Sequence, residues 1–167
     1  KDTVVTADAF SQSDHHKIRI FDVETSKLTR RTMQIGDQGS LWEYLDWMLS
    51  VSSNAAAAMT MREAMLLRHF GRDYPVPEAE IERFFKETPA KELTELFHQT
   101  FFEPITRNGL DLEQLRQGSF FTHMGKKKVN GGGNSYGTAR ELMKYVLRME
   151  QGRLVDAFSS RQIKRLL

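Results

Sequence analysis

One apolar stretch, expected to form a helix from about Asn54 to Phe70, constrains the fold of this chain more than any other feature. It opens with four consecutive alanines at positions 55–58 and continues with methionines and leucines on several sides of the expected helix. A helix that is apolar on several sides must be enclosed by neighbouring elements. Alanines let those neighbours approach closely, and methionines fill irregular gaps between them. Gly71 is expected to end this helix.

An amphipathic helix is predicted immediately before this stretch, ending near Ser50. Ser40 and Glu43 stand at the spacing of a capping box, in which a hydroxyl and a carboxylate each accept a hydrogen bond from a backbone N–H. Apolar residues follow at helical spacing up to Leu49. The triplet Ser52-Ser53-Asn54 then interrupts the pattern, so we expect a bend between two helices there.

Four further helices are predicted from their start signals, which are a first-turn proline or a hydroxyl residue at capping-box spacing. The signals are Pro77, Pro89, the pair Thr138 and Glu141, and the pair Ser159 and Gln162. Pro104 is expected to close the second of these helices, and Gly152 the third.

The remaining segments predict little regular structure. Residues 17–23 suggest one short strand near the N-terminus, because Ile18 and Ile20 alternate with polar residues. Residues 105–137 are expected to be loop-rich, with one helical turn around residues 112–115. Within them, the lysines at 126–128 and the glycines at 131–133 suggest a flexible, solvated segment. The sequence therefore predicts a mostly α fold in a single helical domain over residues 1–167.

Composition excludes several classes of function. The hydrophobic fraction is 40%, the charged fraction 28% and the formal charge +2, with acids and bases interleaved, so nothing demands a nucleic-acid partner. The sequence contains no run of about 18 apolar residues, so no membrane span is predicted. With no cysteine, disulfides and a cysteine nucleophile are excluded. No phosphate-binding loop is present, and no cofactor or metal site is expected, because no pair of histidines has helical ligand spacing. The histidines are His15, His16, His69, His98 and His123.

Three blocks, in this order, resemble the serine β-lactamases and penicillin-binding proteins. The triplet at 52–54 with its alanine-rich helix resembles the Ser-x-Asn element of that family, and the capped helix at 40–49 leads into it. Residues 137–142, Gly-Thr-Ala-Arg-Glu-Leu, followed by 152–154 and 159–162, resemble the helix after the family's Ω-loop and the short helix before its last active-site strand. The resemblance covers about 36–71 and 135–167 and implies the helical lobe of a β-lactamase- or transpeptidase-like α+β fold.

The resemblance also implies roles for two side chains. Ser52 matches the serine that relays a proton to the leaving nitrogen, and Asn54 matches the asparagine that hydrogen-bonds the substrate amide and the catalytic lysine. A hydroxyl and a carboxamide can each both donate and accept hydrogen bonds. The implied substrate is a β-lactam or peptide-like amide that passes through an acyl-enzyme. The implied location is periplasmic or secreted.

The chain differs from the family pattern in what it lacks. No Ser-x-x-Lys occurs in its 167 residues, and no Lys-Thr-Gly or Lys-Ser-Gly follows the last predicted helix. Ser53 stands where class A enzymes commonly have aspartate, and the Glu-x-x-Leu-Asn pattern is missing. Either the chain is a piece of a longer enzyme or it is a degenerate relative. We favour the piece, whose nucleophile and final strand lie in the remaining lobe of the fold.

Two alternatives stay open. Ser52 and Asn54 are also good helix-capping residues, and capping alone would account for them. The chain could instead be a non-catalytic helical module that binds a protein or peptide in an aromatic groove. The candidate groove residues, which could equally be core, are Phe84, Phe85, Phe97, Phe101, Phe120 and Phe121.

Overall fold

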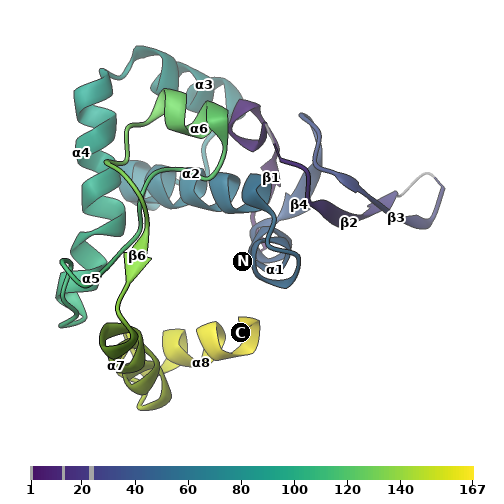
Figure 1. Ribbon diagram of the computed structural model, residues 1–167. Coiled ribbons are helices and arrows are strands. Elements are labelled where there is room, and N and C mark those ends of the chain that lie inside the picture. The colour runs from purple at the N-terminus through teal and green to yellow at the C-terminus, as the bar shows by residue number, and fades with distance from the viewer. Residues whose placement is uncertain (1, 13, 23–24) are drawn as a thin grey trace. The chain divides into compact units, whose positions relative to one another are not determined.

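The computed structural model describes residues 2–12, 14–22 and 25–167. They form two compact units: residues 1–87 with 120–129 make the first unit, and residues 88–119 with 130–167 make the second. The single domain predicted over residues 1–167 stays a prediction. Both consist mainly of helices with a few short strands (Figure 1). No helix in the described part of the chain combines the length and apolarity that crossing a membrane requires.

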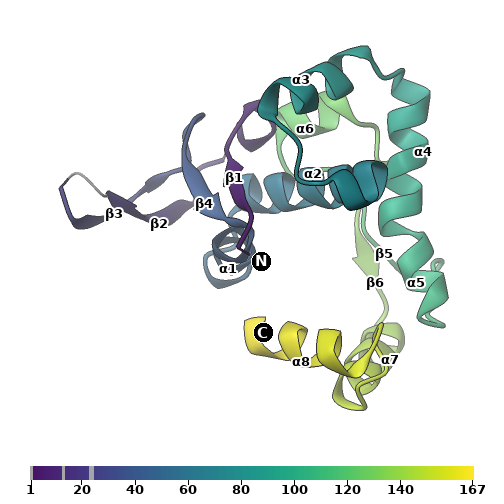
Figure 2. The same cartoon turned by 180° about the vertical axis from the view of Figure 1, so that it is seen from behind.

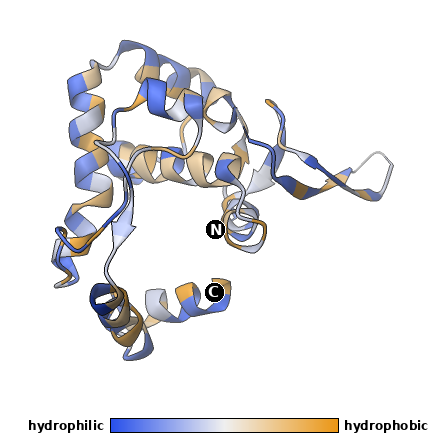
Figure 3. Ribbon diagram, in the orientation of Figure 1, coloured by the Kyte–Doolittle hydropathy of each residue, from blue (hydrophilic) through white to orange (hydrophobic). Residues whose placement is uncertain are grey.

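The first unit is built around the alanine-rich helix α2 (Asn54–Phe70), whose predicted bounds are confirmed. Its residues 55–59 are all buried, as expected for a helix enclosed by neighbours. Helix α1 (Leu41–Ser50) packs against it, and so does the 3₁₀ helix η1 (Ala9–Ser11). The capping box of Ser40 and Glu43 is confirmed: the hydroxyl accepts from the Glu43 amide, and the carboxylate accepts from the Ser40 amide at 2.7 Å. The apolar character of α2 is visible in Figure 3.

The expectation of one short strand was wrong for this unit. Strand β2 (Lys17–Asp22) matches it, except that Val23 lies outside the described residues, and β2 pairs with an unexpected β3 (Lys27–Thr32). A second antiparallel pair joins β1 (Val4–Thr6) to β4 (Gln38–Ser40), which lies just before α1 (Figure 2). Four of the six residues of β3 are exposed and three are charged, so it lacks the alternation of apolar residues that identifies a strand in a sequence.

The first unit is completed by η2 (Gly71–Asp73), α3 (Glu78–Glu87) and α6 (His123–Lys128). The flexible segment expected around the three lysines is instead the last turn of α6. This helix is capped by Thr122, whose hydroxyl accepts from the Gly125 amide at 3.1 Å and donates to the Phe10 carbonyl at 2.6 Å. Its buried anchor comes from residues far apart in the sequence, so local composition did not reveal it.

The second unit contains four helices, α4 (Ala90–Phe101), α5 (Glu103–Arg107), α7 (Ala139–Glu150) and α8 (Ala157–Leu166), and a pair of strands, β5 (Leu115–Arg116) and β6 (Tyr136–Gly137). Pro104 does not end the helical segment, because it occupies the first turn of α5, where its missing N–H is harmless. A helical turn was expected around 112–115; a turn covers residues 112–114, but Leu115 instead begins β5.

Two predicted start signals in the second unit were only partly right. Thr138 caps α7 by accepting from the Glu141 amide, but the Glu141 carboxylate does not return the bond. It accepts from the Asp111 amide at 2.7 Å and pairs with Lys144 at 2.8 Å. Helix α8 begins two residues before Ser159, whose backbone amide donates to the true cap, Asp156. At α7 the Asp111 amide and Lys144 bind the Glu141 carboxylate in place of the N-cap amide, and at α8 the Asp156 carboxylate caps the helix in place of Ser159.

Candidate functional site

The predicted bend between α1 and α2 is present, and it is three residues long. Val51 ends α1, Ser52 follows with a positive φ of 55°, and Ser53 is the N-cap of α2. The Ser53 amide donates to the Trp47 carbonyl at 3.2 Å, which closes the bend back onto the buried side of α1. A non-glycine residue rarely adopts positive φ, so Ser52 occupies a sharply turned backbone position.

Ser53, the middle residue of the triplet, does the capping. Its hydroxyl accepts from the Ala56 amide at 3.1 Å and donates to Oδ2 of Asp14 at 2.8 Å. The same Oδ2 accepts from the Ala55 amide at 2.9 Å. A carboxylate at the start of a helix satisfies exposed N–H groups and interacts favourably with the helix dipole. Ser53 and Asp14 together therefore cap α2, and Ser52 is not needed for that role.

Ser52 and Asn54 are therefore placed differently from their neighbour Ser53. Ser52 is exposed and Asn54 is partly exposed, whereas Ser53 is buried. Within the described residues, neither the Ser52 hydroxyl nor the Asn54 amide group makes a hydrogen bond. Both polar groups are thus free to meet a ligand, and the backbone beneath them is held by the cap. Asn54 is the first residue of α2, so its position is fixed by a long, enclosed helix.

The pKa of Asp14 reflects how tightly this carboxylate is held. Its side chain is only 3% exposed, and burial alone would raise the pKa. Hydrogen bonds from the Ala55 amide, from the ring and amide of His16, and from Ser53 outweigh burial and lower the pKa to about 2. Asp14 is therefore ionised at neutral pH. Sequence reasoning missed this residue because its partners on α2 lie about forty positions away.

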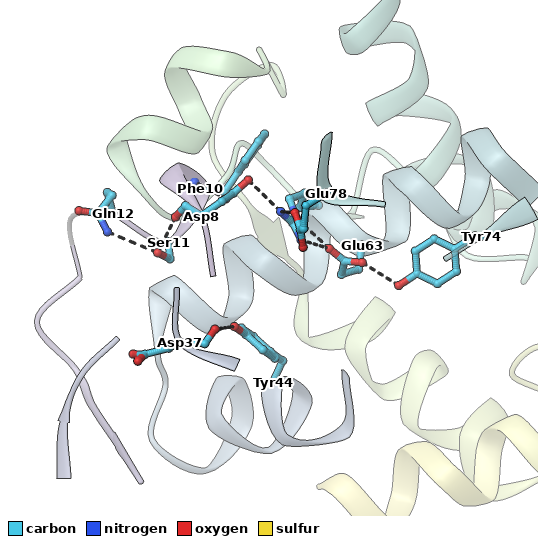
Figure 4. A network of polar contacts seen from close by, with 10 residues as sticks. Asp8, Phe10, Ser11, Gln12, Asp37, Tyr44, Glu63, Tyr74 and Glu78 are labelled. Carbon is cyan, nitrogen blue, oxygen red and sulfur yellow. Dashed lines mark hydrogen bonds and ion pairs between the residues drawn. The ribbon is translucent and has the colours of Figure 1, made fainter. Parts of the chain in front are cut away.

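Helix α2 is anchored further along by a buried ionic network (Figure 4). The side chain of Arg62 is 1% exposed and pairs with Asp8 at 2.8 Å and with Glu63 at 2.6 Å. Tyr74 donates to the other Glu63 oxygen at 2.7 Å, and Glu78 lies 3.7 Å from the guanidinium. Burial raises the pKa of Tyr74 and of Glu78. Because all these charges are paired, the network is suited to holding α2 in place rather than to chemistry.

Two of the hollows among the described residues are lined largely by apolar side chains, one in each unit. In the first unit, a hollow of about 440 Å³ is lined by residues that include Phe10, Phe85, Lys86 and Lys128. In the second unit, a hollow of about 410 Å³ is lined mainly by apolar side chains. Its lining includes Leu115, Arg116, Tyr136, Leu142 and Tyr145. Neither of these hollows is lined by Ser52 or Asn54.

The phenylalanines of the candidate groove are divided between core and surface. Phe85, Phe97 and Phe120 are buried, while Phe121 is 44% exposed. The buried members pack against other rings; Phe85 and Phe120, for example, lie 4.8 Å and 5.2 Å from Phe10, centroid to centroid. Half of this set is therefore core, while Phe84 and Phe101 are partly exposed, so the core interpretation holds for only part of it.

One group in the described residues has the composition of a metal site. Asp14, His15 and His16 each offer one ligand atom, and these atoms all lie within 4.8 Å of one another. Three consecutive residues do not have the helical ligand spacing that indicates a metal site in a sequence, so the sequence did not point to this group. Comparison with protein-family models, with curated protein sequences and with solved structures found no match.

Proposed function

We propose that this chain is the helical part of a penicillin-recognising serine hydrolase of the β-lactamase-like or DD-peptidase-like kind. Its substrate is an amide or a β-lactam, which is processed through an acyl-enzyme. The nucleophilic serine, its lysine and the final active-site strand are supplied by the remaining lobe, because no Ser-x-x-Lys occurs in these 167 residues. The family resemblance adds that the protein acts in the periplasm or is secreted. No cofactor takes part in this reaction.

The observation that carries the proposal is the division of labour within the triplet at 52–54. Ser53 caps α2 together with Asp14, which leaves the Ser52 hydroxyl and the Asn54 carboxamide unbonded at a rigid bend. Ser52 directly follows Val51, the C-cap of α1, and its positive φ of 55° is a conformation common where a helix ends; in it the hydroxyl stays exposed. A hydroxyl there can pass a proton to a leaving nitrogen, and a neighbouring carboxamide can orient the substrate amide.

Exposed apolar side chains support the need for a second lobe. On α7, Met143 is 67% exposed and Leu147 is 56% exposed, and on α8 Phe158 is 66% exposed. Met143 and Leu147 stand four residues apart and so on one face of α7, and exposed apolar surface of this kind commonly marks an interface. The proposed occupant is the remaining lobe of the same fold.

The test uses the intact protein and a fluorescent penicillin. A covalent adduct, visible on a denaturing gel and by the added mass, is the expected result. Slow or absent hydrolysis of a chromogenic cephalosporin would then place the enzyme nearer the DD-peptidases. Absence of both adduct and hydrolysis would contradict the proposal.

The alternative is a non-catalytic module of the same fold that binds a protein or peptide. The observation that favours it is the apolar hollow of about 410 Å³ in the second unit, where Tyr136 and Leu142 meet Arg116. Arg116 lies over the Tyr136 ring at 4.8 Å, so its charge borders an aromatic surface. The adduct experiment separates the two functions, because a binding module forms no acyl-enzyme.

A further inference from the structure

The three consecutive residues Asp14, His15 and His16 form a compact cluster in the first unit. The two imidazole rings are stacked, with centroids 4.4 Å apart and planes inclined by 30°. Nδ1 of His16 lies 2.6 Å from Oδ1 of Asp14. Side chains of consecutive residues usually diverge from an extended backbone. Here the backbone brings both rings together beside a carboxylate.

The two oxygens of Asp14 have separate partners. Oδ2 accepts hydrogen bonds from the Ser53 hydroxyl and the Ala55 amide at the start of α2. Oδ1 accepts from the backbone amides of His15 and His16, at 2.8 and 3.1 Å, and is the oxygen that faces the His16 ring. The carboxylate is thus locked in orientation before any ligand arrives. Preorganisation of this kind reduces the entropy lost on binding.

The histidines remain open to solvent while the carboxylate is buried. His15 is exposed and the His16 side chain is 28% exposed, against 3% for Asp14. An ion can therefore reach the imidazole nitrogens without disturbing the packing of the unit. With three of four tetrahedral positions taken by these residues, one position would stay open to solvent or to a further ligand.

The ligand types define the class of ion. Two imidazole nitrogens and one carboxylate oxygen suit zinc and its first-row neighbours cobalt, nickel and copper. Calcium and magnesium prefer sites made entirely of oxygen atoms. In a tetrahedral zinc site with bonds of about 2.0–2.1 Å, ligand atoms lie about 3.3 Å apart. The present atoms are within 4.8 Å of one another, so closing on an ion needs a movement of about 1.5 Å at most.

We propose that Asp14, His15 and His16 bind a divalent transition-metal ion of the zinc class through Oδ1 and one nitrogen of each imidazole. Oδ2 of the same carboxylate keeps its hydrogen bonds from Ser53 and Ala55. An ion on Oδ1 therefore holds the capping carboxylate in place and stabilises the N-terminal end of α2. This site is independent of the hydrolase proposal, since it rests on none of the catalytic assignments.

The test is a calorimetric titration of the tag-free protein with zinc chloride, repeated with cobalt chloride while the visible spectrum is recorded. One equivalent should bind, and cobalt should develop the absorption bands of nitrogen and oxygen coordination. His15→Ala and His16→Ala should each weaken binding at least about tenfold, since even outer-shell changes reach that size. Circular dichroism of each variant shows that the fold is kept.

His123→Ala is the matched control, because His123 is an exposed histidine outside the cluster. It should bind zinc as the wild type does, and thermal unfolding of both should shift upward with added zinc. The proposal is overturned if the double variant His15→Ala/His16→Ala binds zinc as tightly as the wild type. It is also overturned if His123→Ala weakens binding as much as the cluster variants do, or if no zinc binds at all.

Discussion

Asp14 accepts a hydrogen bond from the hydroxyl of Ser53 at 2.8 Å, although 39 positions separate them in the chain. Because the Ser53 hydroxyl also accepts from the Ala56 amide, one serine and one aspartate together complete the N-terminal cap of α2. This pair frees the residues on either side, Ser52 and Asn54, from a structural role.

The Asp14 carboxylate should make the stability of the first unit depend on pH in acid. Its pKa is about 2 in the folded protein, against 3.8 ordinarily. The folded value is the lower one, so the stabilisation is present above about pH 4 and is lost as the pH falls towards 2. The difference corresponds to about 2 kcal/mol in the free energy of unfolding. Urea unfolding between pH 5 and pH 2 measures it, and Asp14→Asn should remove that part of the pH dependence. An identical pH dependence in the variant would contradict the assignment.

Single replacements of Ser53 and Ser52 should show that only Ser53 contributes to stability as the cap of α2. Ser53→Ala removes two hydrogen bonds at the start of α2 and should lower the free energy of unfolding by about 1–2 kcal/mol. Ser52→Ala removes an exposed, unbonded hydroxyl and should change stability by less than about 0.5 kcal/mol. Urea unfolding of both variants at pH 7 is the measurement. Equal losses in the two variants would mean that Ser52 also has a capping role.

The buried guanidinium of Arg62 should contribute far more to the stability of the fold than an exposed guanidinium does. Arg62→Met leaves the carboxylates of Asp8 and Glu63 without their partner and should destabilise the protein by roughly 3–5 kcal/mol. Arg83→Met serves as the control, because Arg83 is 63% exposed and its 3.7 Å pair with Glu80 is worth little. The two variants are compared by thermal unfolding at pH 7. A loss below about 1 kcal/mol for Arg62→Met would show that the network does not hold α2.

The exposed apolar face of α7 should prove to be covered in the intact protein. Met143 is 67% exposed here, and if the remaining lobe packs over it, Met143→Lys should cost more than about 1 kcal/mol. Leu28→Lys is the matched control, because Leu28 is 61% exposed on strand β3 and should tolerate the change within about 0.5 kcal/mol. Chemical unfolding of the intact protein distinguishes them. If both variants lose equally little stability, α7 faces solvent in the intact protein and the prediction is contradicted.

Local signals in the sequence predicted the part of the fold that they directly determine. The bounds of α2 followed from its apolar pattern and from Gly71, and the start of α1 from Ser40 and Glu43. Strand β3 was missed because pairing with β2, and not its own charged composition, makes it a strand. Helix α6 was missed for a similar reason, since its cap depends on a hydrogen bond from Thr122 to Phe10, 112 positions away.

In the candidate site, too, the features set by local sequence could be predicted and those set by distant residues could not. The bend at the triplet could be predicted, because two helical patterns meet there. Which of its residues is the cap could not, because that depends on Asp14, which the chain brings to the bend only on folding. The metal-ligand cluster was overlooked although its members are adjacent, since adjacency alone does not tell whether two rings will stack on one side of the backbone.

The most direct test of the central claim is the rate at which the intact protein is acylated by a fluorescent penicillin, compared between wild type and Ser52→Ala. General acid–base groups contribute roughly 10²–10⁴-fold to rates, so Ser52→Ala should slow acylation by about a hundredfold or more. Ser50→Ala, a change at an exposed serine two residues away, should leave the rate unaltered. Wild-type protein that forms no adduct, or a Ser52→Ala variant acylated at the wild-type rate, would contradict the account.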